Sequence, residues 1–140
     1  MTKYYSFKNK KVEVYTNETN LVFVKNENKD LFIIYFEEIQ KPVSYYEGKN
    51  LVNDVSYGIS CKVHLDNIEF EASTFTDSRD EFRPSVGCLL SFKKLYPRLV
   101  KYLIETSYVS NKEANNVFSS VRHVIDNYPI PVFKPKVYYA

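Results

Sequence analysis

IEFEASTFTDSRDEFRPSVGCLLSFKKLYPRLVKYLI, residues 68–104, is the stretch in which the chain changes from strand to helix. Ile68–Phe75 alternates apolar and polar side chains, which predicts a strand with one buried face. A polar loop follows, and apolar residues then recur at helical spacing from Pro84, a residue that suits a first helical turn. Pro97 interrupts that pattern, so it either kinks the helix or begins a second one. The stretch therefore predicts a strand, a loop and a helical segment.

Short segments rich in Val, Ile, Tyr and Phe dominate the chain before this stretch, and turn-forming residues separate them. The expected strands are residues 3–7, 11–15, 21–25, 31–36, 57–65 and 68–75. Leu31–Phe36 is continuously apolar, which predicts a central strand covered on both faces. Residues 37–55 have no clear period and contain Pro42 and Gly48. We interpret residues 37–55 as a long loop.

The C-terminal part of the chain carries a clear helix start, because Ser110 and Glu113 form a capping-box pattern before an apolar stripe. Residues 127–140 contain three prolines and are expected to be extended. The sequence thus predicts one α+β domain over residues 1–140, mostly β over 1–75 and helical over 84–126. We expect an antiparallel sheet of five to six strands, followed by two or three helices packed on one face.

Composition limits the class of protein. A chain of 140 residues can build a core without disulfides or metals, and two cysteines do not make a disulfide framework. No apolar run approaches the roughly 20 residues of a membrane helix, and the first residues do not resemble a signal peptide. We expect a cytoplasmic protein with no membrane partner. The 13 tyrosines, the absence of tryptophan and the excess of Lys over Arg indicate an AT-rich coding sequence, as in low-GC bacteria and their phages.

Metal and catalytic sites are weakly indicated. Cys61, His64, Cys88 and His123 could supply four zinc ligands, but residues three apart on a strand point to opposite faces. The chain has no nucleophile motif, and its three glycines lie too far apart for a phosphate-binding loop. We expect no catalytic residue, no metal and no cofactor, and therefore not an enzyme.

Carboxylates gather in the loop after the strand, where Asp77, Asp80 and Glu81 alternate with Arg79 and Arg83. Such interleaving favours local ion pairs, or acidic capping of the helix N-terminus, over a ligand or metal role.

A cationic face follows on the helix, because Lys94, Arg98 and Lys101 are spaced i, i+4 and i+7. Residues 92–140 hold 8 basic and 3 acidic residues, so this part of the chain is the most basic. The face is either solvated or able to bind phosphates of a nucleotide or nucleic acid. With Phe82 and Arg83 just before the helix, these three residues are the expected ligand-binding set.

Residues 71–95 resemble a segment of the Thoeris anti-defence proteins of the first type, which sequester a cyclic nucleotide signal. The matching positions are Ala72, Asp80, Phe82, Gly87, Leu90 and Ser91, with Lys94 at a position that holds Arg in the pattern. Thr76 and Ser78 depart from the pattern, which has Cys and Pro there. The resemblance implies a non-enzymatic binder, often with its ligand at a subunit interface. Phe82 would then stack on a base or pack the hairpin onto the helix, and Arg83, Lys94 and Arg98 would meet phosphates.

These observations predict a small non-enzymatic binding protein of a phage or mobile element that inhibits a host defence system in the host cytosol. It would sequester a nucleotide signal or block a nuclease, so its partner is a nucleotide signalling molecule or a host defence protein. A nucleic-acid-binding module that uses the basic helix face and tyrosines is one alternative. A protein–protein inhibitor without a small ligand, acting through the acidic middle or a sheet edge, is the other. A homo-oligomer is compatible with each.

Overall fold

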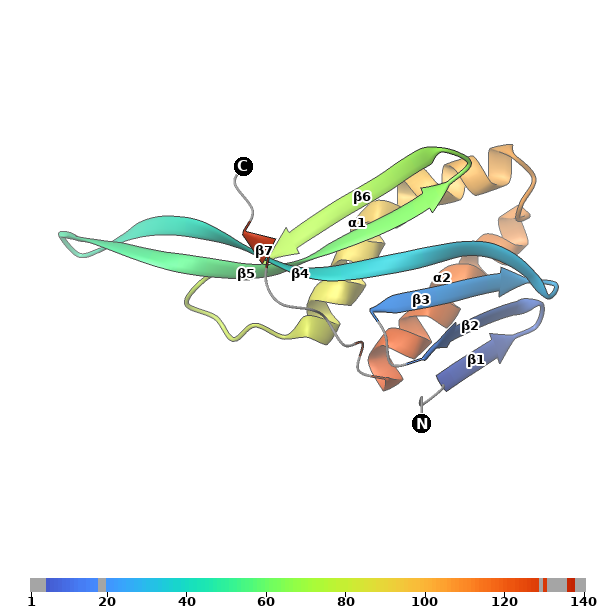
Figure 1. Ribbon diagram of the computed structural model, residues 1–140, viewed down its shortest axis with the longest axis horizontal. Helices are drawn as coiled ribbons and strands as arrows, with labels where there is room; N and C mark the ends of the chain where they lie inside the picture. Colours follow the sequence, from blue (N-terminus) through green and yellow to red (C-terminus); the bar gives the residue numbers. More distant parts are fainter. Residues whose placement is uncertain (1–4, 18–19, 129, 131–135, 138–140) are drawn as a thin grey trace.

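The computed structural model describes residues 5–17, 20–128, 130 and 136–137. Six antiparallel strands lie side by side in chain order (Figure 1). They are β1 (Tyr5–Asn9), β2 (Val12–Thr16), β3 (Leu21–Asn26), β4 (Lys29–Glu47), β5 (Asn50–Leu65) and β6 (Ile68–Phe75). A two-residue strand, β7 (Lys136–Val137), pairs in parallel with β4.

Two-residue turns join several of these strands. Glu27 and Asn28, between β3 and β4, have φ angles of 54° and 66°, and Asp66 and Asn67, between β5 and β6, have φ angles of 52° and 64°. Positive φ at both central residues matches the twist of paired strands, and Asn and Asp tolerate this backbone conformation. These turns fix the register of both hairpins.

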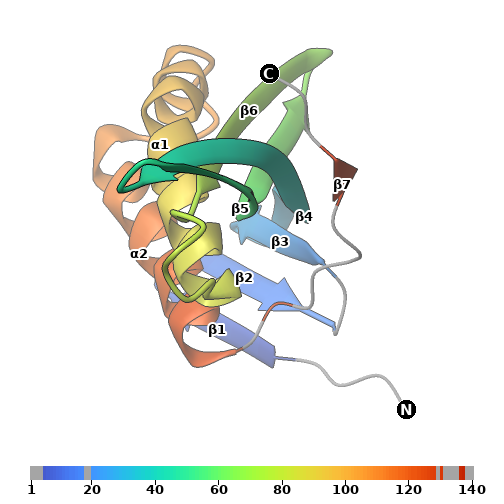
Figure 2. The ribbon, with the colours of Figure 1, turned by 90° about the vertical axis from the view of Figure 1, so that its left-hand side faces the viewer.

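Two helices, α1 (Pro84–Glu105) and α2 (Asn111–Asn127), pack on one face of the sheet (Figure 2). The α1 helix lies on β5 and β6, and α2 lies on β1 and β2. The α1 helix continues through Pro97, which is exposed to solvent, so this proline neither ends the helix nor splits it. The predicted α+β architecture, with helices on one face of an antiparallel sheet, is confirmed.

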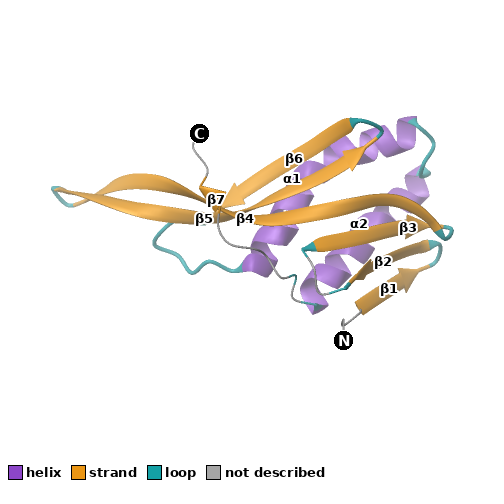
Figure 3. Ribbon diagram, viewed as in Figure 1, coloured by secondary structure: helices purple, strands orange, loops and turns teal. Residues whose placement is uncertain are grey.

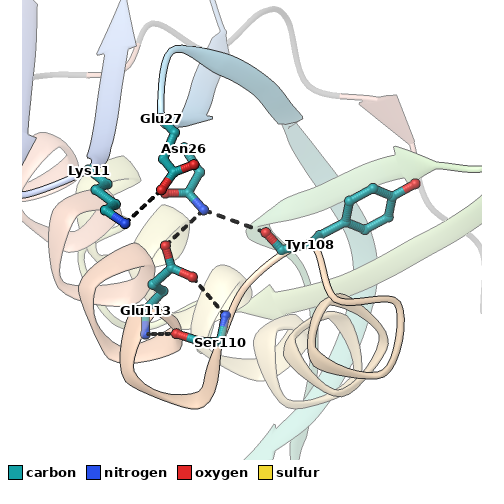
Figure 4. A network of polar contacts seen from close by, with 6 residues as sticks. All are labelled: Lys11, Asn26, Glu27, Tyr108, Ser110 and Glu113. Carbon is teal, nitrogen blue, oxygen red and sulfur yellow. Dashed lines mark hydrogen bonds and ion pairs between the residues drawn. The ribbon is translucent and has the colours of Figure 1, made fainter.

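A polar network fixes the start of α2 against the β3–β4 turn (Figure 4). The hydroxyl of Ser110 accepts a hydrogen bond from the Glu113 N–H at 3.2 Å, and the Glu113 carboxylate accepts one from the Ser110 N–H at 2.8 Å. The same carboxylate accepts a bond from the Asn26 side chain at 3.1 Å. Nearby, Lys11 and Glu27 form an ion pair at 2.7 Å. The predicted capping box thus also joins α2 to the sheet.

The expectation that Leu31–Phe36 is covered on both faces is wrong. The segment lies in β4, at the centre of the sheet, but both helices cover the same face. Ile34 and Phe36 are fully buried beneath the helices, whereas Ile33 is 46% exposed. Its continuous apolar character therefore reflects one buried face and one apolar exposed face.

The expectation of a long loop over residues 37–55 is also wrong, because these residues form a hairpin. Pairing of β3 with β4 ends at Leu21↔Tyr35, and pairing of β6 with β5 ends at Phe75↔Gly58. The β4–β5 pairing continues to Glu47↔Asn50. Residues 41–56, here called the arm, therefore project from the sheet as a two-stranded ribbon (Figure 1). Val43 and Tyr45 on one face of the arm are half-buried beside the loop after β6, but no residue of the arm belongs to the hydrophobic core, so the arm needs no strict alternation of apolar residues.

The expected extended tail, residues 127–140, falls largely outside the described residues. Asn127 ends α2, Ile130 is buried against the core, and Lys136–Val137 forms β7 beside Ile39–Gln40 at the base of the arm.

Candidate functional site

The cationic face of α1 lies against the outer edge of the sheet. The ammonium group of Lys94 donates to the backbone carbonyl of Ser73 at 3.1 Å, and the guanidinium of Arg98 donates to the carbonyl of Glu71. A two-residue turn joins β5 to β6. From Ile68 onward, the backbone N–H and C=O groups of every second residue therefore bond to β5, and the backbone groups of the residues between them face outward. The Glu71 and Ser73 carbonyls thus face outward, and among the described strands β6 pairs only with β5. Cations that satisfy such carbonyls protect an exposed edge from pairing with another chain.

The remaining predicted ligand-binding residues lie elsewhere on the same helix or before it. Phe82 is half-buried, and its ring packs against the ring of Tyr57 at 5.9 Å between centroids. Arg83 is the N-cap of α1, is exposed and pairs with Glu81 at 3.3 Å. Lys101 is exposed. The set is therefore divided between the start of α1 and the edge of β6, and none of its residues lines the cleft at the base of the arm.

Two of the three loop carboxylates, Asp77 and Glu81, pair locally with Arg79 and Arg83, as predicted. Asp77 accepts two hydrogen bonds from the guanidinium of Arg79, at 3.0 and 2.9 Å, and one from its backbone N–H at 3.0 Å. These bonds from Arg79 hold the pKa of Asp77 at about 2. The alternative prediction, acidic capping of the helix, is wrong, because α1 has no acidic residue in its first turn and no side-chain cap.

The cysteines and histidines do not converge. Cys61 and Cys88 are free and buried in the core, and burial raises the pKa of Cys88 to about 12 and that of Cys61 well above its usual value. His64 is exposed on the opposite face of β5, as the strand geometry predicts. His123 stacks on Phe7 with 3.8 Å between centroids. Over the part of the chain that the structure describes, no three His, Cys, Asp or Glu residues could hold a metal ion together.

The arm has two outer edges, and each is obstructed. In β4, every second residue counted back from Glu47 forms backbone hydrogen bonds with β5. Position 42 is not one of these residues, so a backbone N–H there would point away from β5. Pro42 has no N–H to offer a further strand there. In β5, the N–H of Val55 points outward and is bonded by the Asp54 side chain at 2.8 Å. These features disfavour extension of the arm by strand addition.

The faces of the arm, by contrast, are open near its tip. Tyr46 and Leu51 lie opposite each other across the two strands, and they are 72% and 57% exposed. Gly48, with a φ of +62°, forms the turn between them. Residues 41–56 contain two basic and two acidic residues, so the arm carries no net charge. Exposed apolar side chains on a projecting neutral ribbon are suited to contact with an apolar surface.

A cleft of about 310 Å³, here called the arm-base cleft, lies between the arm and the start of the loop that joins β6 to α1 (teal in Figure 3). Two cations of the cleft lie over aromatic rings. The Lys41 ammonium is 4.2 Å from the centroid of Phe75, and the guanidinium carbon of Arg79 is 4.9 Å from that of Tyr45. The lining residues are Lys41, Val43, Ser44, Tyr45, Ser56, Phe75, Thr76, Asp77, Ser78 and Arg79.

The sequence does not predict the arm or the arm-base cleft. The available signal was a turn-like segment around Gly48 between two tyrosine- and valine-containing runs, which is typical of a hairpin. The sequence correctly predicts a local ion pair for Arg79, but the position of Arg79 beside Tyr45 depends on a residue 34 positions earlier in the chain. Contacts of that separation cannot be read from spacing alone.

Within the described residues, no helix is both long enough and apolar enough to cross a membrane. Comparisons with protein-family models, with curated proteins and with solved structures found no match.

Proposed function

We propose that this chain is a small non-enzymatic binding protein that inhibits another protein by docking its arm onto it. One observation carries the proposal. The arm projects beyond the rest of the fold (Figure 1), and its tip exposes Tyr46 and Leu51 to solvent. An isolated two-stranded ribbon is at best marginally stable in water, and apolar side chains at its tip gain most from burial in a partner.

The mode of contact follows from the edges and faces of the arm. Pro42 and the Asp54–Val55 hydrogen bond disfavour a partner that adds a strand to the ribbon. Tyr46 and Leu51, which form a cross-strand pair, would instead enter an apolar groove as anchors. Tyrosine is enriched among the residues that contribute most to protein–protein binding.

A protein partner is favoured over a nucleic acid. Nucleic-acid binding depends on cations that neutralise phosphates, and the arm has none in excess. Lys94 and Arg98, which the sequence suggested for phosphates, donate instead to carbonyls of β6. The alternative of a nucleic-acid-binding module therefore has less support than the alternative of a protein–protein inhibitor.

The absence of an assembled reaction chemistry among the described residues supports binding over catalysis. Cys61 and Cys88 are buried with raised pKa values, so they are poor nucleophiles at neutral pH. Of the inhibitory roles expected from the sequence, blocking a nuclease or another defence protein of a host cell fits a projecting arm. A protein that sequesters a small molecule does not require a projecting arm.

Photo-crosslinking tests the proposal. A photoreactive phenylalanine analogue placed at position 46 should capture one stoichiometric partner in host cells. The matched control carries the same probe at position 33, on the exposed face of the sheet, because Ile33 is also an exposed apolar residue. Equal labelling from both positions, or no partner from position 46, would rule out docking by the arm tip.

A further inference from the structure

The arm-base cleft has a composition that the arm tip lacks. It brings two cations, Lys41 and Arg79, to a recess that also contains aromatic rings and hydroxyl groups. We propose that this cleft binds a small anion attached to a ring, such as the phosphate or carboxylate of an aromatic compound. The binding site is separate from the protein-docking surface at the tip, and it does not depend on the proposed inhibitory function.

Lys41 is the residue best placed to hold the anionic group. Its ammonium lies 4.2 Å from the centroid of Phe75, so the ring fixes a long side chain that would otherwise move freely. Among the ion pairs between described residues, Lys41 is paired with no carboxylate. Its charge therefore stays available to an anion that enters the cleft.

Arg79 supplies a second cation, which is bonded to Asp77. Two of its guanidinium nitrogens bond to Asp77, and its guanidinium carbon lies 4.9 Å from the centroid of Tyr45. A guanidinium has five N–H donors, so two bonds to Asp77 leave others for a ligand. Asp77 thus positions Arg79 and also lowers the net charge of the cleft, whose lining holds two cations and one carboxylate.

The remaining lining and the size of the cleft limit the ligand. Val43, Tyr45 and Phe75 supply apolar surface, and Ser44, Thr76 and Ser78 supply polar groups at the same recess. Its volume of about 310 Å³ is near the lower limit of ligand pockets, which span about 300–1,000 Å³. A ring with one anionic group fits this space better than an oligomeric or multiply charged ligand.

Calorimetry and NMR titration test the proposal with named probes. Phenyl phosphate, benzoate, adenosine monophosphate and inorganic phosphate are titrated into the full chain, with adenosine as an uncharged control. We expect the ring-bearing anions to bind and to shift amide signals of residues 41–45 and 76–79. Comparison of phenyl phosphate with benzoate shows whether phosphate or carboxylate is preferred.

Matched variants decide whether the cleft is responsible. Lys41→Met keeps the length of the side chain and removes its charge, and we expect a loss of affinity of about tenfold or more, because the charge-assisted hydrogen bond to the anion is lost. Lys49→Met, at the tip of the same arm, should bind as the unaltered chain does. Thermal unfolding of each variant confirms that the fold is kept.

Three results would overturn the proposal. The first is no binding of any ring-bearing anion at millimolar concentration. The second is equal binding of adenosine and adenosine monophosphate, which would show that the charge is irrelevant. The third is equal loss of affinity in the Lys41→Met and Lys49→Met variants. By contrast, a Tyr46→Ser, Leu51→Ser double variant should bind the probes normally, because the tip lies outside the cleft.

Discussion

The guanidinium of Arg98 donates a hydrogen bond to the backbone carbonyl of Glu71 on the outer edge of β6. Lys94, one turn earlier on α1, does the same for Ser73. A cationic helix face that looks like a phosphate site in the sequence therefore satisfies the backbone of an edge strand. Together with Pro42 and the Asp54–Val55 bond on the arm, it leaves side-chain contact as the main route to a partner.

Removal of both edge cations should promote self-association. In a Lys94→Ala, Arg98→Ala variant, the outward carbonyls of β6 become free to pair with another chain. We expect the free energy of unfolding to fall by about 1–3 kcal/mol, because two hydrogen bonds are lost and each contributes about 0.5–1.5 kcal/mol. Sedimentation velocity should show dimers or larger species that increase with concentration.

The control for this variant is Lys93→Ala, Lys101→Ala, which removes equal charge from exposed positions on the same helix. It should remain in the same association state as the unaltered chain. Self-association of both double variants to the same extent would show that net charge, and not the β6 edge, is responsible.

The Asp77–Arg79 pair predicts a pH dependence. Arg79→Gln removes both guanidinium bonds, so the pKa of Asp77 should rise from about 2 toward its ordinary value of about 3.9. In the unaltered chain the folded-state pKa is below the unfolded value. The stabilisation by this pair is therefore present above about pH 4 and is lost as the pH falls through about 2.

NMR titration of the carboxyl carbon of Asp77 measures both pKa values directly, and urea unfolding at several acidic pH values measures the linked stability. Other carboxylates titrate in both the unaltered chain and the Arg79→Gln variant, so their contributions cancel in the difference in stability between the two proteins. An unchanged pKa of Asp77 in the Arg79→Gln variant would contradict the assigned pair.

Gly87 is required by the close approach of α1 to β5. A Cβ added to Gly87 would lie 2.6 Å from the Cγ1 atom of Ile59, which is fully buried. Gly87→Ala gains helix propensity of about 1 kcal/mol, but overpacking a core costs about 1–3 kcal/mol. We expect a net destabilisation in chemical unfolding.

A double-mutant cycle separates the clash from other effects. In an Ile59→Ala background the Cγ1 atom is absent, so Gly87→Ala should be neutral or stabilising there. An equal cost in both backgrounds would show that the contact with Ile59 is not the cause.

Ser110→Ala should weaken the start of α2. The change removes the hydroxyl that accepts the Glu113 N–H, and loss of an N-cap side chain costs about 1 kcal/mol. Ser119→Ala, in the exposed middle of α2, is the control and should change the free energy of unfolding much less. Equal costs would contradict a specific role of the cap.

The sequence predicts most of the sheet and both helices, because their signals are local. Strand alternation in Ile68–Phe75 and the Ser110–Glu113 capping box each act within a few residues of the chain. The arm could not be recognised in this way. Its two strands pair with each other outside the hydrophobic core, so only a half-buried face imposes a period on residues 41–56.

The predicted binding residues illustrate the same limit. The spacing of Lys94 and Arg98 correctly places them on one face of a helix, but the partner of that face is set by tertiary packing against β6. Likewise, Lys41 and Phe75, and Tyr45 and Arg79, meet only because the arm returns beside the loop after β6. Such sites depend on contacts between distant segments.

Native mass spectrometry of the chain purified from host cells tests the central claim, docking of the arm tip, most directly. We predict that the unaltered chain carries one partner protein in fixed stoichiometry, and that a Tyr46→Ser, Leu51→Ser variant with an unchanged melting temperature appears without it. A partner retained by the variant, or no partner on either protein, would contradict the account.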